Sequence, residues 1–248
     1  MTASAAALGS DLSALQRMVA QYYTDKVTRH GPTPRGVDWS CQPSQDMRFV
    51  QLLKLCDFSQ PFRLNDIGCG YGALLSYLKK RHRRANVDYL GVDLSAAMIT
   101  HAQRLFGKRP LTSFEAACRA TRVAHYSVAS GIFNVKLDQT HDVWEQFIAD
   151  TLQQMNSTSL RGFAVNFLTP PQHARPTPEL YYAAPQQWRT YCEQALGAQV
   201  ELVCDYGMRE YTLLVRAVQT GNRITGRSGT ADSANAASAQ AGTPPRSG

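Results

Sequence analysis

The stretch LNDIGCGYGALL places an acidic residue and three glycines between two apolar runs. This pattern is typical of a buried parallel strand that turns sharply into a helix, where nucleotide-containing cofactors bind. Gly68, Gly70 and Ala73 satisfy the dinucleotide pattern G-x-G-x-x-A, which would serve hydride transfer. Gly68, Gly70 and Gly72, with Asp66 just before them, would instead fit a methyl donor. A glycine pattern alone does not decide between the two.

The charge before the turn favours the methyl donor. Asp66 would repel a pyrophosphate that approaches the helix N-terminus. S-adenosylmethionine has no phosphate, and it carries an ammonium and a sulfonium that a carboxylate attracts. Asp93 lies 25 residues after Gly68, at the end of VDYLGVD, and can accept hydrogen bonds from both ribose hydroxyls in either cofactor class. A nicotinamide oxidoreductase is therefore the less favoured alternative.

The elements that position these residues alternate between strand and helix from position 62 onward. The predicted strands are 62–67, 87–93, 111–117, 125–133 and 161–168. The predicted helices between and after them are 71–81, a helix capped by Ser95 that ends near 106, 140–155 and 185–196. Before them we expect a frayed segment 1–10, a helix over 11–29, a break at HGPTPRGVDWS and a helix capped by Ser44.

The C-terminal segment VELVCDYGMREYTLLVRA holds two β-rich runs that are too close for a helical crossover, so the last strand must pair antiparallel. The pattern predicts an α/β fold, a Rossmann-like, doubly wound and mostly parallel seven-stranded sheet with a C-terminal antiparallel strand. We predict an N-terminal helix and candidate lid over 1–44, the main domain over 45–220, and a disordered tail over 221–248 that is rich in Ser, Ala, Gly, Thr and Pro.

The composition bounds the partners and the compartment. The net charge is +7, and the densest basic run, from Lys79 to Arg84, ends the helix after the glycine turn, on the rim opposite any ligand there. The six cysteines form no C-x-x-C pair, which favours a reducing compartment and predicts no metal site. We expect a cytoplasmic protein without a signal peptide or a membrane partner.

Over roughly residues 45–217 the chain resembles the class I S-adenosylmethionine-dependent methyltransferases. GPTPRGVDW, LNDIGCGYG, YLGVDLS and YSVASGIFNVK together resemble a bacterial group whose substrate is unassigned. The resemblance implies S-adenosyl-L-methionine as the cofactor, a methionine site at the glycine turn, ribose on Asp93 and adenine against Met98. Where the family often has an acidic adenine contact, EAACRA offers only small residues and Arg119. The expected cofactor-binding residues are Asp66, Gly68, Cys69, Gly70, Asp93, Leu94, Met98 and Ser130.

The acceptor is expected at the carboxyl ends of the strands. His173, on a loop after the fifth strand, is the candidate general base. An N-terminal segment that folds over the cofactor would exclude water, although its aromatic residues could equally serve as core. The expected substrate or lid residues are Tyr22, Tyr23, Lys26, Trp39, Phe133, Asn134 and Tyr181.

The favoured function is methyl transfer to oxygen or nitrogen of a small-molecule acceptor by direct displacement. An RNA or ribosome methyltransferase is the alternative suggested by the positive charge, although the fourth strand lacks the N/D-P-P-Y/F signature and the chain has no Pro-Cys nucleophile. A non-catalytic cofactor-binding protein is a third hypothesis. The sequence predicts neither the acceptor nor the oligomeric state.

Overall fold

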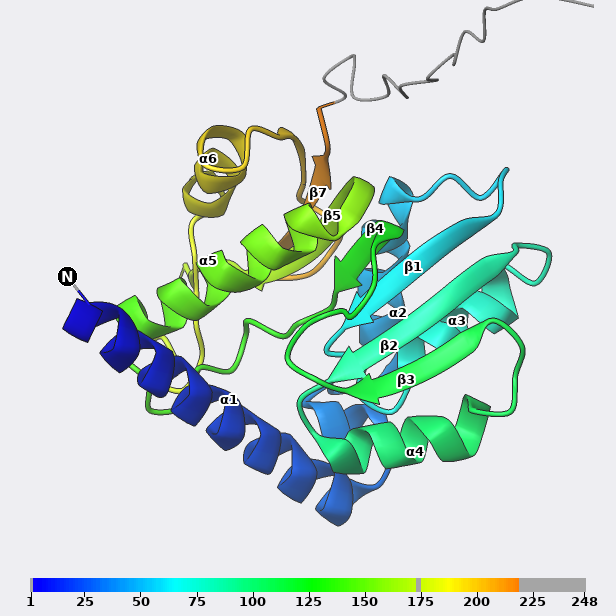
Figure 1. Ribbon diagram of the computed structural model, residues 1–248, viewed down its shortest axis with the longest axis horizontal. Coiled ribbons are helices and arrows are strands. Elements are labelled where there is room, and N and C mark those ends of the chain that lie inside the picture. Colours follow the sequence, from blue (N-terminus) through cyan, green and yellow to red (C-terminus); the bar gives the residue numbers. More distant parts are fainter. Residues whose placement is uncertain (1, 173–174, 219–248) are drawn as a thin grey trace, which may run out of the picture. The chain divides into compact units, whose positions relative to one another are not determined.

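The computed structural model describes residues 2–172 and 175–218, with the backbone alone for residues 2–11 (Figure 1). Within this part of the chain, seven strands form one sheet in the order β3-β2-β1-β4-β5-β7-β6. The strands are β1 (Phe62–Ile67), β2 (Val87–Asp93), β3 (Thr112–Ala116), β4 (Ala124–Ala129), β5 (Ser159–Leu168), β6 (Gln199–Val203) and β7 (Glu210–Arg216).

The strand directions confirm the predicted sheet. β3, β2, β1, β4 and β5 pair in parallel, whereas β7 pairs antiparallel with both β5 and β6. Ile67, the last residue of β1, is in register with Val92 of β2 and Ala129 of β4. The carboxyl ends of three neighbouring strands therefore meet at one edge, where ligands bind in open α/β sheets.

Helices cover both faces of the sheet. The helical elements are α1 (Thr2–His30), η1 (Pro34–Val37), α2 (Gln42–Leu52), η2 (Leu53–Leu55), α3 (Ala73–Arg81), α4 (Ala96–Phe106), α5 (His141–Ser157) and α6 (Pro185–Gln194). Buried side chains of α2, α3 and α4 share one hydrophobic core with one side of the strands, and those of α5 and α6 share a second core with the other side. The fold is doubly wound.

α1 passes the carboxyl ends of β2 and β3 (Figure 1). Leu15 and Val19 belong to the core beneath α5 and α6, whereas Val27, further along α1, belongs to the core of α2, α3 and α4. Tyr23, between them, packs against both cores. The helix is thus anchored on each side of the sheet and bridges the edge where the ligand is expected.

Several local predictions were wrong. The first helix begins at Thr2, so the segment expected to fray is helical over its described residues. α2 begins at Gln42 with Cys41 as its N-cap, and the Ser44 hydroxyl donates to the Cys41 carbonyl (2.9 Å) from inside the first turn. Its start places the predicted domain boundary at 44/45 inside a helix. The fourth strand ends at Ala129, and the residues after it form a loop.

Two further sequence expectations concern the C-terminal tail and membrane contact. The predicted tail, 221–248, lies outside the described residues. None of the described helices combines the length and the hydropathy that a bilayer crossing requires.

Candidate functional site

The glycine turn after β1 has the backbone that a methyl-donor pattern needs. Gly68, Gly70 and Gly72 all have positive φ, at 71°, 53° and 86°. Residues with a Cβ avoid this region, which explains the alternate glycines. Gly72 is the N-cap of α3, and Ala73 is the first helical residue. The three residues with left-handed backbone are therefore the three glycines of the methyl-donor pattern. In the dinucleotide pattern the third position would be Ala73, which is helical.

Asp93 ties the end of β2 to this turn. Its Oδ2 accepts a hydrogen bond from the Gly70 backbone N–H, and its Oδ1 accepts one from the Ser95 backbone N–H, both at 2.8 Å. Burial raises the pKa of Asp93 to about 6, although the two N–H donors lower it. Each carboxylate oxygen has a second lone pair, so Asp93 can still accept from ribose hydroxyls.

Ser95 extends the same corner toward α1. Its hydroxyl caps α4 by accepting from the Met98 N–H (3.3 Å), and it shares a hydrogen bond of 2.7 Å with the Thr24 hydroxyl. Capping hydroxyls of this kind stabilise a helix by about 1 kcal/mol. The Ser95–Thr24 bond joins the loop after β2 directly to the helix that covers it.

Asp66, near the end of β1, is a buried carboxyl group. Its exposed fraction is 2%, and its Oδ2 accepts a 2.5 Å hydrogen bond from the Tyr89 hydroxyl. Burial is the main reason that the pKa of Asp66 rises to about 7; the Tyr89 bond lowers it and the charge of Asp93 raises it. No cation pairs with Asp66 among the described residues. A buried carboxyl group without a cation partner is a candidate site for a cationic ligand group.

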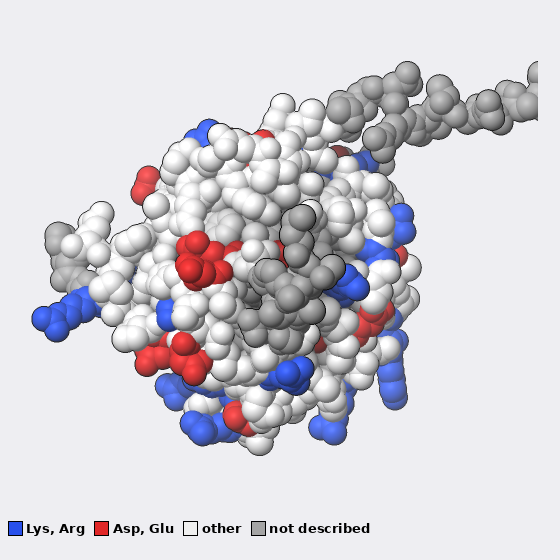
Figure 2. Space-filling model, turned by 60° about the vertical axis from the view of Figure 1, so that its left-hand side comes forward, with Lys and Arg blue, Asp and Glu red and all other residues white. Residues whose placement is uncertain are grey.

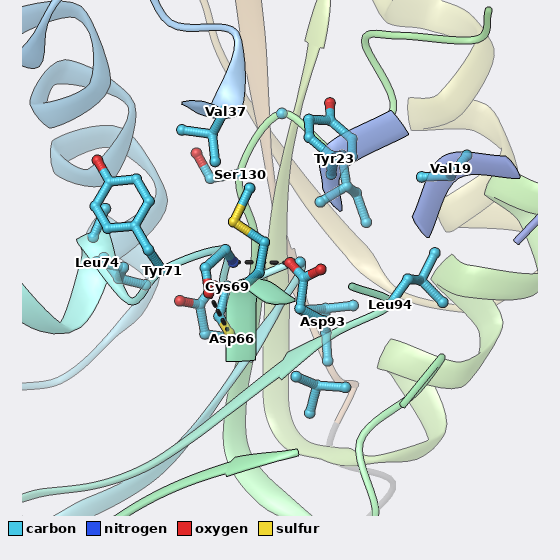
Figure 3. A pocket seen from close by; sticks show the side chains of 18 of the residues that line it. Val19, Tyr23, Val37, Asp66, Cys69, Tyr71, Leu74, Asp93, Leu94 and Ser130 are labelled. Atoms are coloured by element: carbon cyan, nitrogen blue, oxygen red, sulfur yellow. Dashed lines mark hydrogen bonds between the residues drawn. The ribbon is translucent and has the colours of Figure 1, made fainter. Parts of the chain in front are cut away.

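Asp66, Asp93 and the first two glycines of the turn line a cavity at the carboxyl edge of the sheet (Figure 3). Ten of the residues predicted from the sequence line it together: Tyr23, Trp39, Asp66, Gly68, Cys69, Gly70, Asp93, Leu94, Met98 and Ser130. Asp66 and Asp93 are the charged residues among them. The Ser130 Oγ is buried and has no hydrogen-bond partner in the described part of the chain.

The N-terminal segment supplies one wall of the cavity. Val19 and Tyr23 line it from α1, and Val37 lines it from the end of η1. Figure 3 shows Tyr23 and Val37 across the cavity from Asp66. A 2.6 Å ion pair between Lys26 of α1 and Asp38 holds α1 and η1 together. The segment is placed as a cover, and its buried residues also give it a role in the core.

Two predicted lid residues lie beside the cavity and do not line it. Lys26 is engaged by Asp38, and its ammonium lies 5.2 Å from the centre of the Tyr22 ring. Tyr22 in turn makes an edge contact with Tyr23, with ring centres 5.1 Å apart. Both residues support the covering segment from outside.

The structure places Phe133 and Tyr181 in the hydrophobic core, and neither of them lines the cavity. Phe133 is 1% exposed and stacks on Phe167 at 5.2 Å between ring centres. The Tyr181 hydroxyl donates to Glu145 (2.9 Å) and accepts from the Trp188 indole (3.1 Å). Phe133 is thus buried among apolar groups, and the Tyr181 hydroxyl has hydrogen-bond partners inside the protein, away from the cavity.

Two further candidates remain without an assigned place in the cavity. Asn134 is buried, and its backbone carbonyl accepts from the Tyr181 N–H (2.9 Å). Its Oδ1 has no partner among the described residues. His173 lies outside the residues that the structure describes.

Sequence reasoning missed several lining residues. Gln45 and Phe49 come from α2, and Phe147 and Thr151 come from α5. Each pair is spaced i, i+4, so its members share a helix face. That spacing was visible in the sequence, but nothing in it indicated which turn of each helix reaches the sheet edge. Ala117 and Cys118, which follow β3, also line the cavity where an adenine contact could not be identified.

Comparison with known proteins agrees with this geometry. The sequence pattern of a methyltransferase domain family matches residues 65–131. Rv1506c of Mycobacterium tuberculosis (strain ATCC 25618 / H37Rv), itself named only provisionally as a methyltransferase, is 42% identical over 165 residues, which are 66% of this chain and 98% of that protein.

Solved structures show the same fold. Magnesium protoporphyrin IX methyltransferase from Synechocystis PCC 6803, solved with bound SAH, superposes with a TM-score of 0.57 at 12% identity, over 82% of this chain and 99% of that one. An O-methyltransferase family protein from Burkholderia thailandensis gives a TM-score of 0.53 at 14% identity, over 70% and 56% of the two chains.

The family assignment rests on the identity to Rv1506c over nearly its whole length. The matched domain family covers the glycine turn, Asp93 and the start of the loop after β4. The superposition on magnesium protoporphyrin IX methyltransferase spans 82% of this chain, in which the seven strands form one sheet with an antiparallel β7. The chain belongs to the class I S-adenosylmethionine-dependent methyltransferases, and S-adenosyl-L-methionine is its cofactor.

Proposed function

We propose that this methyltransferase transfers its methyl group to an oxygen or nitrogen of a small-molecule acceptor by direct displacement. The observation that carries the proposal is the composition of the cavity wall. Apart from Asp66 and Asp93, the residues that line it are uncharged, and many are apolar or aromatic. Such a lining, with few polar groups, is typical of small-molecule sites.

We further propose roles for the cavity residues. Asp93 holds the ribose hydroxyls, Asp66 faces the ammonium of the methionine moiety, and Met98 packs against adenine. The fit is supported by two features of the described residues: Asp66 has no cationic partner, and the buried Ser130 hydroxyl has no hydrogen-bond partner. Each deficit corresponds to a polar or charged group of the cofactor.

Bound S-adenosylmethionine supplies a methyl group activated by its sulfonium. The protein's contribution is to align the acceptor and to exclude water, for which positioning alone can supply effective molarities of about 10⁵–10⁸ M. Val19, Tyr23 and Val37 form an apolar cover suited to exclude water. Burial raises the pKa of Tyr23 well above its usual value, so its phenol stays neutral at physiological pH.

The distribution of cations argues against the RNA alternative. An RNA enzyme needs Lys and Arg side chains around its pocket to engage phosphates. Arg48, which stacks on the lining residue Trp39, is paired with Glu210, and Lys26 of the covering helix is paired with Asp38. On the face shown in Figure 2, acidic side chains lie between the basic ones. The basic run that starts at Lys79 lies in the last turn of α3 and beyond, toward the amino ends of the strands.

The proposal is tested by incubating the protein with methyl-labelled S-adenosylmethionine and separated small-molecule and RNA fractions. We expect a labelled product in the small-molecule fraction that can be extracted into organic solvent, and no label in RNA. The control is Asp93→Ala, which should lower the labelling when the cofactor concentration is kept below the dissociation constant of this variant. Label that appears only in RNA would overturn the proposal and favour the alternative.

A further inference from the structure

Trp39 lines the cofactor cavity and is held between two other residues. The Arg48 guanidinium lies over its ring, 3.6 Å from the ring centre. The indole also rests against Gly131, where a Cβ would overlap the ring. Gly131 follows Ser130 in the loop after β4, and both of these residues line the cavity. Trp39 therefore closes the space between the covering segment and this loop.

Arg48 is itself fixed by a buried ion pair. Its exposed fraction is 5%, and that of Glu210 is 4%. The Arg48 Nε donates to Glu210 Oε2 (2.8 Å) and Oε1 (3.0 Å), and Nη2 also donates to Oε1. The Nη1 donates to the Ser44 carbonyl (2.8 Å). The plane of the guanidinium is thus set by partners on α2 and β7.

The same ion pair is connected back to Gly131. The Asn166 side-chain amide donates to Glu210 Oε2 (2.8 Å), and its Oδ1 accepts from the Gly131 N–H (2.8 Å). A closed circuit of contacts therefore links five residues: Trp39, Arg48, Glu210, Asn166 and Gly131. It joins the loop between η1 and α2, α2 itself, the loop after β4, β5 and β7.

Stability alone does not account for this arrangement. A buried ion pair loses hydration that its attraction only partly restores, and apolar replacements are often neutral or stabilising. What the ion pair provides is a fixed position and plane for the guanidinium. A planar guanidinium can stack on an indole while it forms a fork with a carboxylate, and a lysine ammonium cannot do both.

We propose that Arg48 is a positioning residue for methyl transfer: held by Glu210, it clamps the Trp39 indole against Gly131 and so fixes the wall of the cofactor cavity beside Ser130. Arg48 does not line the cavity, so it acts through Trp39. The proposal concerns the shape of the cofactor site and is independent of the acceptor.

The test uses 5-fluorotryptophan in the full-length protein and ¹⁹F NMR. The three tryptophans give three signals, and Trp39→Phe identifies that of Trp39. The key variant is Arg48→Gln with Glu210→Gln, in which the two amides can hydrogen-bond and no buried charge is left unpaired. We expect a shifted or broadened Trp39 signal, unchanged Trp144 and Trp188 signals, and about tenfold weaker binding of S-adenosylhomocysteine, with the melting temperature largely retained.

The matched control is Arg122→Gln with Asp88→Asn, which removes another ion pair (2.7 Å), one whose residues do not line the cavity. It should leave the Trp39 signal and the affinity unchanged. If the Arg48/Glu210 variant does not fold, Arg48→Lys decides, because it keeps the charge and loses the planar stack. The proposal would be overturned if the folded variant kept the Trp39 signal and the affinity of the unmodified protein. This holds for either variant and for any melting temperature.

Discussion

The Gly70 backbone N–H donates a 2.8 Å hydrogen bond to Oδ2 of Asp93, so the glycine turn after β1 is fastened to the end of β2. The carboxylate that we assign to ribose is thus also a structural partner of the turn. A second bond, from the Ser95 N–H to Oδ1, orients it. Asp93 therefore couples ligand binding to the geometry of the turn. Substitutions of Asp93 must be chosen so that these two effects can be measured separately.

Asp93→Ala is expected to weaken binding of S-adenosylhomocysteine by about 1–3 kcal/mol, because the ribose hydroxyls lose a charged acceptor. Asp93→Asn is the matched variant, since its amide oxygen can still accept from Gly70 or Ser95 while the charge is lost. Its affinity should lie between those of Asp93→Ala and the unmodified protein. Calorimetric titration of the three proteins measures the series. Equal affinities in folded variants would remove Asp93 from the site.

Cofactor binding should strengthen as the pH rises from 5 to 8. Burial raises the pKa of Asp66 to about 7 and that of Asp93 to about 6, so both carboxyls are protonated in the free protein at pH 5. A cationic ligand group favours the ionised forms. Each carboxyl that must lose its proton on binding weakens the affinity by about tenfold per pH unit below its pKa. Titrations with S-adenosylmethionine at several pH values measure the slope, and a flat profile would contradict the assigned role of Asp66.

The stability of the ligand-free protein should respond in the opposite direction. In the folded protein the pKa of both carboxyls lies above the ordinary value of 3.8. Their contribution to the free energy of unfolding is therefore fully present below about pH 4, and it is lost as the pH rises through 6 and 7. The bound cation reverses this preference. The rise in melting temperature on adding cofactor should therefore be larger at pH 8 than at pH 5, as a thermal shift series would show.

Cofactor should protect the covering segment, residues 20–40, from hydrogen exchange. Val37 and Trp39 line the cavity near the C-terminal end of this segment, whereas Val27 is buried in the core. We expect protection to increase most around 34–40 on adding S-adenosylhomocysteine. Tyr23→Ala should weaken cofactor binding as well as stability, because Tyr23 lines the cavity and also packs against both cores.

The control for this experiment is Val27→Ala, which lies on the same helix but does not line the cavity. It should lower the free energy of unfolding by about 1–3 kcal/mol and leave the affinity of the folded protein unchanged. Equal protection of residues 20–40 with and without cofactor would leave α1 and η1 a purely structural role.

Much of the fold was predictable because its signals are local. The buried runs of β1 and β2 begin and end at the predicted residues, and Ser95 caps α4 as expected. Strands and helices alternate along the chain and a short hairpin follows them, and few sheet topologies are compatible with this order. The sheet edge then brings Asp66 and Asp93 to one cavity, as parallel strands require.

The parts that sequence reasoning missed depend on distant contacts. Arg48 and Glu210 are 162 residues apart, and an arginine on a short helix ordinarily indicates a solvated face. Tyr181 was expected at the acceptor site, but its position is decided by Glu145 and Trp188, which meet it only in the folded chain. Apolar residues after a strand have the same pattern whether they face a cavity or the core.

The central claim is that the cavity between Asp66, Asp93 and the N-terminal cover binds S-adenosylmethionine. Calorimetric titration of the full-length protein with S-adenosylhomocysteine, and separately with NADH and NADPH, tests it most directly. We predict one S-adenosylhomocysteine site per chain and no measurable heat of binding for either nicotinamide cofactor. Tighter binding of NADH or NADPH than of S-adenosylhomocysteine would contradict the account.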